Sequence, residues 1–238
     1  MGHNDIVMLL LYHGAQVDLQ NSFLRTPLFY AAEHGRRNVV NTLLDNGADI
    51  HTFDWKRTGP LHIAISRGHR ATVQLLLERG ADIHATTLSS FTPMHLAAKK
   101  GREDIIRLCL AAGGDPNSCT VPSKSTPLHE AAKKCHSEII NILIKAGADV
   151  ECSDTTHRTP MRIAAALRDK RTEQLLVKAG AKAQHLLSAQ TVEEQEETRC
   201  KVLQLEKIRR QDERASGENS KKALFRSHTM RLMATMKK

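Results

Sequence analysis

Thr92-Pro93-Met94-His95-Leu96-Ala97-Ala98 opens with two residue types that favour the start of a helix. Thr92 can cap a helix with its side-chain oxygen, and Pro93 suits the first helical turn because its φ is already fixed. Gly101 follows, where a positive φ can turn the chain. Residues 104–110 (DIIRLCL) then carry an apolar face at helical spacing. The segment is therefore predicted to form a helix, a turn, a second helix and a loop.

The same pattern returns along the chain at a nearly constant interval. The glycines that end the second helix follow one another after 33, 33, 33, 34 and 33 residues, and the prolines that start the first helix keep the same period. A fixed period near 33 indicates an array of stacked units, each burying its apolar face against its neighbours. The glycines are Gly14, Gly47, Gly80, Gly113, Gly147 and Gly180, and the prolines are Pro27, Pro60, Pro93, Pro127 and Pro160.

These residues resemble the ankyrin repeat, with its T-P-L-H-x-A-A start and its G-A-D end. The resemblance covers about residues 1–184, and its repetition makes it specific. It implies an all-α solenoid of stacked helix-turn-helix units with connecting loops. The expected units are a partial repeat at 1–25 and repeats at about 26–58, 59–91, 92–125, 126–158 and 159–184. The motif stands as Thr26-Pro27-Leu28, Pro60-Leu61-His62-Ile63-Ala64, Thr126-Pro127-Leu128-His129-Glu130-Ala131-Ala132 and Thr159-Pro160-Met161, besides the stretch at Thr92.

Several positions depart from the ankyrin pattern. Gly59 replaces the Thr before Pro60, so this helix is expected to lack a side-chain cap. Cys135 and Arg168 replace the glycine of the turn between helices, which costs on the order of 1 kcal/mol if the turn is left-handed. The loops are not expected to form ideal hairpins, because their glycine is also missing. Leu24, Arg57, Ser90, Lys124 and His157 stand in its place.

The two ends of the chain differ from the repeats. The first residues match a second helix whose partner helix is absent, so Ile6, Leu9 and Leu10 are expected to lack one neighbour, and the chain is interpreted as a fragment or a shortened form. Residues 191–214 are predicted to form a charged helix with a capping box at Thr191. Its apolar residues are too few for a convincing coiled coil. Residues 215–238 are predicted to be a basic, flexible and disordered tail.

Composition limits the class of protein. The chain has 238 residues and a formal net charge of +9, and the residues from Lys201 onward carry 11 Lys or Arg against 4 Asp or Glu. The five cysteines are odd in number and scattered, which favours a reducing compartment. The sequence shows neither a secretory signal nor an apolar run long enough to cross a membrane. A cytoplasmic or nuclear protein without membrane contact is expected.

The sequence contains no recognised catalytic motif. A Gly-rich phosphate loop, an H-E-x-x-H zinc motif and a G-x-S-x-G motif are all absent from it. His62, His95 and His129 occupy one repeat position, and in the family this histidine is expected to hydrogen-bond within the loop framework. A structural role is therefore favoured over a metal site. We expect no enzyme activity, no cofactor and no metal.

Binding residues follow from the resemblance, which implies that the concave side of the array is lined by loop tips. Four of the eight aromatic residues of the chain fall at these tips. Exposed aromatic residues are typical interface anchors, although the rings could instead fold back and cover the stack. The candidate tip residues are Phe23, Phe53, Trp55, Lys56, Leu88 and Phe91.

The resemblance also implies that the concave side is lined by the two residues that follow the Ala-Ala pair of each unit. In the middle three units these positions hold five cations and no acid. They suit an acidic or extended segment of a partner protein, and the alternative is a merely solvated charged face. The cations are Arg67, Lys99, Lys100, Lys133 and Lys134.

Three functions are weighed. The first is a monomeric, non-catalytic adaptor or scaffold that binds a protein partner on the concave surface. The second is a nuclear regulator or nucleic-acid-associated protein that acts weakly through the tail, where Arg209-Arg210 and Lys221-Lys222 resemble a bipartite import signal or could contact phosphates. The third is the regulatory part of a larger ankyrin-containing enzyme or channel.

Overall fold

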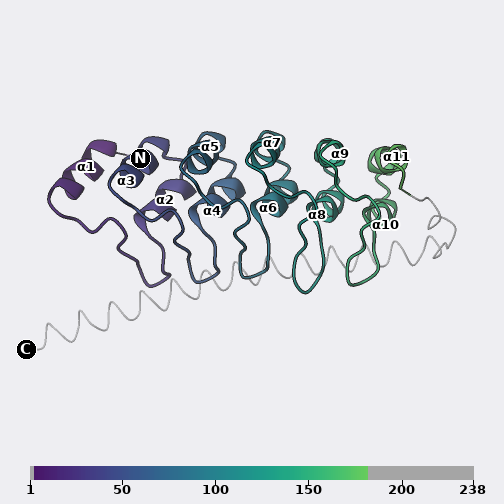
Figure 1. Ribbon diagram of the computed structural model, residues 1–238, viewed down its shortest axis with the longest axis horizontal. Coiled ribbons are helices and arrows are strands. Elements are labelled where there is room, and N and C mark those ends of the chain that lie inside the picture. Colours follow the sequence, from purple (N-terminus) through teal and green to yellow (C-terminus); the bar gives the residue numbers. More distant parts are fainter. Residues whose placement is uncertain (1–2, 182–238) are drawn as a thin grey trace, which may run out of the picture. The chain divides into compact units, whose positions relative to one another are not determined.

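The computed structural model describes residues 3–181, and these residues form eleven α-helices and no strand. The first helix stands alone, and the other ten form five pairs of a first and a second helix (Figure 1). The helices are α1 (Asn4–Tyr12), α2 (Pro27–Glu33), α3 (Arg37–Asp45), α4 (Pro60–Arg67), α5 (Arg70–Glu78), α6 (Pro93–Lys100), α7 (Glu103–Ala111), α8 (Pro127–Lys133), α9 (Ser137–Lys145), α10 (Pro160–Ala166) and α11 (Lys170–Lys178).

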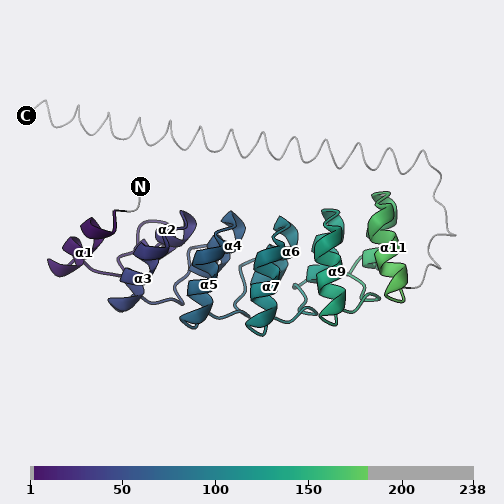
Figure 2. The same cartoon turned by 90° about the horizontal axis from the view of Figure 1, so that it is seen from above.

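The helix pairs stack side by side along the chain. The even-numbered helices from α2 to α10 form an inner row, and the odd-numbered helices from α1 to α11 form an outer row (Figures 1 and 2). Each helix from α2 to α11 packs against its own partner and against the same helix of the neighbouring pair, and α1 packs against α3. The predicted all-helical stack is confirmed.

The inner helices begin where the Thr-Pro pairs predict. The Thr26 side chain accepts a hydrogen bond from the Phe29 backbone N–H at 3.3 Å, and Thr159 does the same for Arg162 at 3.3 Å. Gly59 offers no side-chain cap to α4, as expected. Its own backbone N–H donates to Nδ1 of His62 at 3.2 Å, so this end of α4 still has a side-chain partner.

The core runs continuously through the stack. Inner helices contribute alanines, which allow close approach, and outer helices contribute large aliphatic residues. Ile105, Ile106 and Cys109 of α7, for example, are all fully buried. Burial raises the pKa of the Cys109 thiol to about 12, so this cysteine is an inert core residue.

The turns between the helices of a pair are left-handed, with or without glycine. Gly35, Gly68 and Gly101 have φ values of 65°, 82° and 72°, and Cys135 and Arg168 have φ values of 57° and 54°. The strained conformation anticipated at the two non-glycine positions is therefore present.

Consecutive turns lie against one another. A Cβ added to Gly35 would lie 2.6 Å from the His69 ring, and one added to Gly68 would lie 2.5 Å from Cζ of Arg102. Each of these glycines thus leaves room for a side chain of the next repeat.

The expectation that missing glycines would disturb the hairpins is wrong. All five positions adopt the left-handed conformation, with φ between 50° and 59°. A polar side chain at the start of each loop holds the turn: Asn21 Oδ1 accepts from the N–H groups of Phe23 and Arg25 at 2.9 and 3.1 Å. The residues that act in this way are Asn21, Asp54, Thr87, Thr120 and Asp154.

The N-terminal helix α1 shows the missing neighbour. Ile6, Leu9 and Leu10 are 54%, 57% and 55% exposed. The helix predicted at 191–214, the tail predicted at 215–238 and the import-signal residues lie outside the described residues. Within residues 3–181, the search for a helix long and apolar enough to cross a membrane finds none.

Candidate functional site

The loop tips form a row along one edge of the stack, on the side away from the outer helices (Figure 1). Backbone hydrogen bonds join neighbouring tips: the Trp55 N–H donates to the Phe23 carbonyl at 3.3 Å, and the Leu88 N–H donates to the Lys56 carbonyl at 2.9 Å. A third bond joins Thr155 to the Ser123 carbonyl at 3.0 Å. The first three tips are thus tied together, and so are the last two.

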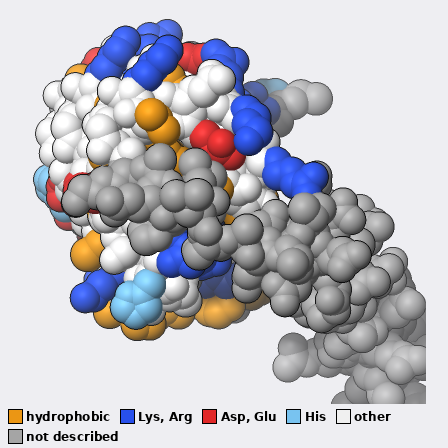
Figure 3. Space-filling model, turned by 90° about the vertical axis from the view of Figure 1, so that its right-hand side faces the viewer, with side chains coloured by type: hydrophobic (Ala, Val, Ile, Leu, Met, Phe, Trp, Pro, Cys, Tyr) orange, Lys and Arg blue, Asp and Glu red, His pale blue; other side chains and the backbone are white. Residues whose placement is uncertain are grey.

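Large apolar side chains project from this edge. Phe23, Trp55 and Leu88 are 52%, 53% and 67% exposed. Nζ of Lys56 lies 4.6 Å from the centre of the Trp55 ring, a cation–π contact that leaves much of the indole accessible. Seen from the α10–α11 end, hydrophobic side chains appear at the lower edge, on the side of the loops (Figure 3). The edge combines apolar anchors with positive charge.

Phe53 and Phe91 are placed differently from these anchors. Both are only partly exposed. A Cβ on Gly59 would lie 3.3 Å from the Phe53 ring, so the ring rests against the start of α4. The Phe91 ring lies 5.7 Å from the His95 ring and 4.8 Å from Nζ of Lys99. These two rings lie against the stack, as the alternative interpretation had it.

At least two of the five cations expected on the concave side are paired with acids. Arg67 donates to Glu33 at 2.5 Å, and Lys133 donates to Glu130 at 2.7 Å. Lys100 and Lys134 are exposed, and Lys99 contacts Phe91. The positive surface is therefore smaller than the five side chains suggest.

Sequence reasoning missed Glu130. It is almost fully buried beneath Lys133, and the Ser125 hydroxyl also donates to it at 3.0 Å. Burial alone would raise the pKa of this carboxyl, but the hydrogen bond and charge of Lys133, with the Ser125 bond, lower it. The sequence did contain a signal, because Glu130 is an acidic residue at a motif position that is apolar or aromatic in the other units. The residues at this position in those units are Tyr30, Ile63, Leu96 and Ile163.

Val121 was also missed. Trp55, Leu88 and Val121 follow one another at steps of 33 residues. Val121 is 72% exposed, and it extends the apolar edge into the fourth hairpin. The period alone could have identified it.

The repeated histidines join each inner helix to the following hairpin. His95 Nδ1 accepts from the Thr92 N–H at 3.3 Å and from the Thr92 hydroxyl at 2.8 Å, while Nε2 donates to the Ser125 carbonyl at 2.9 Å. These partners identify the neutral tautomer with hydrogen on Nε2. Burial lowers the pKa of the ring and outweighs the bond to Ser125, which raises it.

His62 and His129 make the same kind of connection, to the carbonyls of Ala85 and Arg158 at 3.0 Å each. Burial lowers the pKa of both rings as well. The expected hydrogen-bonding role of this histidine is confirmed. A search of residues 3–181 for three or more His, Cys, Asp or Glu side chains that could hold a metal ion finds no such group.

Stacked helix pairs with aligned loops define a repeat solenoid. The sequence-family profile described as "Ankyrin repeats (3 copies)" matches residues 1–54, 54–118 and 94–185. The chain belongs to the ankyrin-repeat family. A search of curated proteins finds no match. Ankyrin repeats are generally non-catalytic modules of protein–protein interaction, so the loop edge and the inner helices are read as a candidate binding surface.

Proposed function

We propose that this protein is an adaptor that binds a partner protein along the tip ridge, which we define as Phe23, Trp55, Leu88 and Val121. The observation that supports the proposal is the exposure of these four apolar side chains, one on each of four successive tips. Large apolar groups open to water raise the free energy of the unbound protein, and a partner that covers them recovers the hydrophobic contribution. Trp55 is the expected central anchor, because tryptophan is enriched among residues that dominate binding energy.

The chemistry of the partner follows from the charges beside the ridge. Lys56 lies over Trp55, and Lys99 of α6 lies over the Phe91 ring. An extended segment with acidic residues flanking an apolar side chain would match this arrangement. Its association rate should fall as salt is added, because exposed charges steer encounter and are screened by ions.

The same proposal makes the protein a monomer that works in a reducing compartment, the cytoplasm or the nucleus. Cys109 is buried, and Cys119 is an exposed free thiol. Free exposed thiols persist where the environment is reducing.

The test uses the full chain as bait in nuclease-treated lysate, with bound proteins quantified by mass spectrometry. The ridge variant is Trp55→Ser/Leu88→Ser. The matched control is Leu167→Ser/Val177→Ser, which removes side chains that are 40% and 48% exposed at the other end of the stack. A partner held through the ridge should be lost with the first variant and kept with the second.

The purified partner should then bind the ridge variant at least about tenfold more weakly, mainly through faster dissociation. Equal losses with the two variants, or unchanged affinity for the ridge variant, would refute the assignment of the ridge.

A further inference from the structure

A second surface lies at the turns between the inner and outer helices. We define the turn row as residues 34–37, 67–70, 100–103, 134–137 and 167–170. These twenty residues carry nine Lys or Arg and two Asp or Glu, a formal charge of +7. The remaining residues of 3–181 carry 13 Lys or Arg and 16 Asp or Glu, a formal charge of −3. The positive excess of the stack is therefore concentrated in the turn row.

The first four turns form one continuous edge. Nε2 of His69 lies 3.0 Å from the Glu33 carbonyl, and a Cβ on Gly101 would lie 2.8 Å from the His136 ring. With Arg102 over Gly68, these contacts bring consecutive turns together from the first to the fourth. Because packed helices are about 8–10 Å apart, the four intervals between five turns span roughly 32–40 Å.

Many of these cations face solvent. Arg36, Arg37 and Lys100 are exposed and make no ion pair among the described residues. Arg102 and Arg168 are also exposed, and neither makes an ion pair among the described residues. Others are paired but still open to solvent: the side chain of Arg67 is 56% exposed beside Glu33, and that of Lys170 is 80% exposed beside Glu173.

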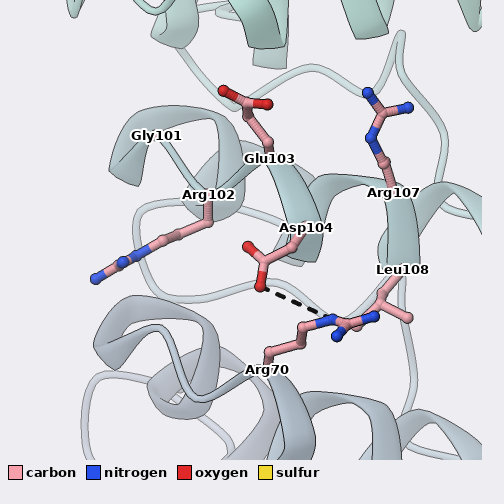
Figure 4. Close-up of a pocket in the computed structure, with 7 residues that line it drawn as sticks. All are labelled: Arg70, Gly101, Arg102, Glu103, Asp104, Arg107 and Leu108. Atoms are coloured by element: carbon pink, nitrogen blue, oxygen red, sulfur yellow. Dashed lines mark ion pairs between the residues drawn. The ribbon is translucent and has the colours of Figure 1, made fainter.

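A shallow hollow opens beside the third turn (Figure 4). Arg70 reaches Asp104 at 3.9 Å, the only ion pair drawn among the residues of this view. Arg102 and Arg107 turn away from that pair, so Asp104 does not engage their guanidinium groups (Figure 4).

We propose that the turn row binds the sugar–phosphate backbone of a double-stranded nucleic acid. Six of its nine cations are arginines, whose planar guanidinium matches phosphate geometry. A duplex carries about one negative charge per 1.7 Å of axis and is stiff over the length of the row.

The composition of the turn row disfavours other ligands. The row holds no Phe, Trp or Tyr, on which single-stranded bases would stack. Leu167 is its only large apolar residue, so a protein partner would find no buried anchor there. Binding is therefore independent of base sequence, since backbone contacts carry no sequence information. This surface is separate from the tip ridge and does not depend on it.

The test measures fluorescence anisotropy of a labelled DNA duplex of about 24 base pairs with the full chain, between about 50 and 200 mM salt. The row variant is Arg36→Gln/Arg37→Gln/Lys100→Gln. The matched control, Lys124→Gln/Lys145→Gln/Lys178→Gln, removes three exposed cations elsewhere on the stack. Both variants keep the basic residues beyond Lys201, so the contribution of these residues cancels.

We expect the row variant to bind at least about tenfold more weakly and to reduce the slope of log K against log salt by about 2–3, since each lost phosphate contact contributes about 0.9. The control should change the slope by less than about 1. The charge-conserving variant Arg36→Lys/Arg37→Lys/Lys100→Arg should keep the slope, which separates lost charge from lost folding.

Three outcomes would overturn the inference. Equal losses of affinity in the row variant and the control would show that binding depends only on the net charge of the protein. An unchanged slope of log K against log salt in the row variant would show that the turn row does not contact the duplex. Tighter binding to a polyglutamate peptide than to the duplex at the same salt would assign the row to an acidic protein segment.

Discussion

Individual residues in this chain hold conformations that their type disfavours. Among residues 3–181, seven residues other than glycine have φ values between 50° and 59°, a region that costs an L-residue on the order of 1–2 kcal/mol. In the hairpins a side-chain oxygen accepts the N–H groups of the turn and offsets this strain, as Asp154 does for Thr156 and Arg158. Cys135 lies in a turn between helices rather than in a hairpin, and its φ is 57°.

We predict that Cys135→Gly stabilises the protein. Glycine relieves the left-handed strain but loses more backbone entropy on folding, so the net gain is about 0.5–1 kcal/mol. Urea unfolding measures this as a higher free energy of unfolding.

Gly101→Ala provides the opposite case, because its Cβ would lie 2.8 Å from the His136 ring. It should destabilise the protein. A stability for Cys135→Gly equal to or below that of the parent chain would contradict the strain assigned to this turn.

At the scale of elements, the buried histidines connect each inner helix to the hairpin of the next unit. His95 links the start of α6 to Ser125, and it can do so only while neutral, because its Nδ1 accepts two hydrogen bonds from Thr92. The connection between the start of α6 and the hairpin therefore depends on the protonation state of His95.

We predict that the free energy of unfolding falls as the pH falls below about 6.5. Burial lowers the pKa of His62, His95 and His129 in the folded state, so in this range the unfolded chain binds more protons. Stability then rises with pH, by up to about 1.4 kcal/mol per pH unit for each histidine. The loss continues until the pH reaches the lowered pKa of the folded state.

Urea unfolding at several pH values between about 5 and 7.5 tests this linkage. His95→Gln should reduce the slope, because it removes a ring whose pKa is lowered by burial. A parent chain whose stability does not change over this range would exclude the neutral tautomer.

The elements were largely predictable from sequence. Thr-Pro starts and glycine ends recur with the period, so the helices from α2 to α11 were located by local chemistry. The hairpin turns were not, because Asn21 and Asp54 act through side-chain bonds to residues two and four positions later, and a search for glycine does not detect them.

The candidate site was only partly predictable, because it depends on contacts between units. The loop tips followed from the period, and Trp55 and Leu88 lie exposed on them. The inward lean of Phe53 depends on the space left by Gly59, and the burial of Glu130 depends on Ser125 from the preceding loop. The spacing of residues in the sequence identifies such positions, but it does not show which side chains they contact in the folded stack.

At the scale of the whole molecule, the energetic weight of a residue depends on where its unit lies in the stack. Leu10 and Leu43 occupy the same position in α1 and α3, 33 residues apart. Leu43 is 2% exposed and Leu10 is 55% exposed, because α1 has no inner helix beside it among the described residues. Nearest-neighbour packing, rather than residue type, decides the difference.

We predict that Leu43→Ala costs about 3 kcal/mol of unfolding free energy, the range of a buried leucine that leaves a cavity. Leu10→Ala should cost less than about 1 kcal/mol. Urea unfolding of the two variants measures the contrast, and similar losses would show that α1 is covered by another part of the chain.

The stacking of one turn on the next limits how such an array can be recombined. A side chain of the next repeat lies over each of Gly35, Gly68 and Gly101: His69, Arg102 and His136. Cys135 carries a Cβ, and the shorter Asp169 follows at that place in the sequence. Two neighbouring units therefore share one constraint, so a duplicated, deleted or grafted unit fits only beside a compatible neighbour. Gene shuffling should therefore keep the two residues that meet at the junction between neighbouring repeats together, because a single repeat cannot be exchanged without regard to its neighbour.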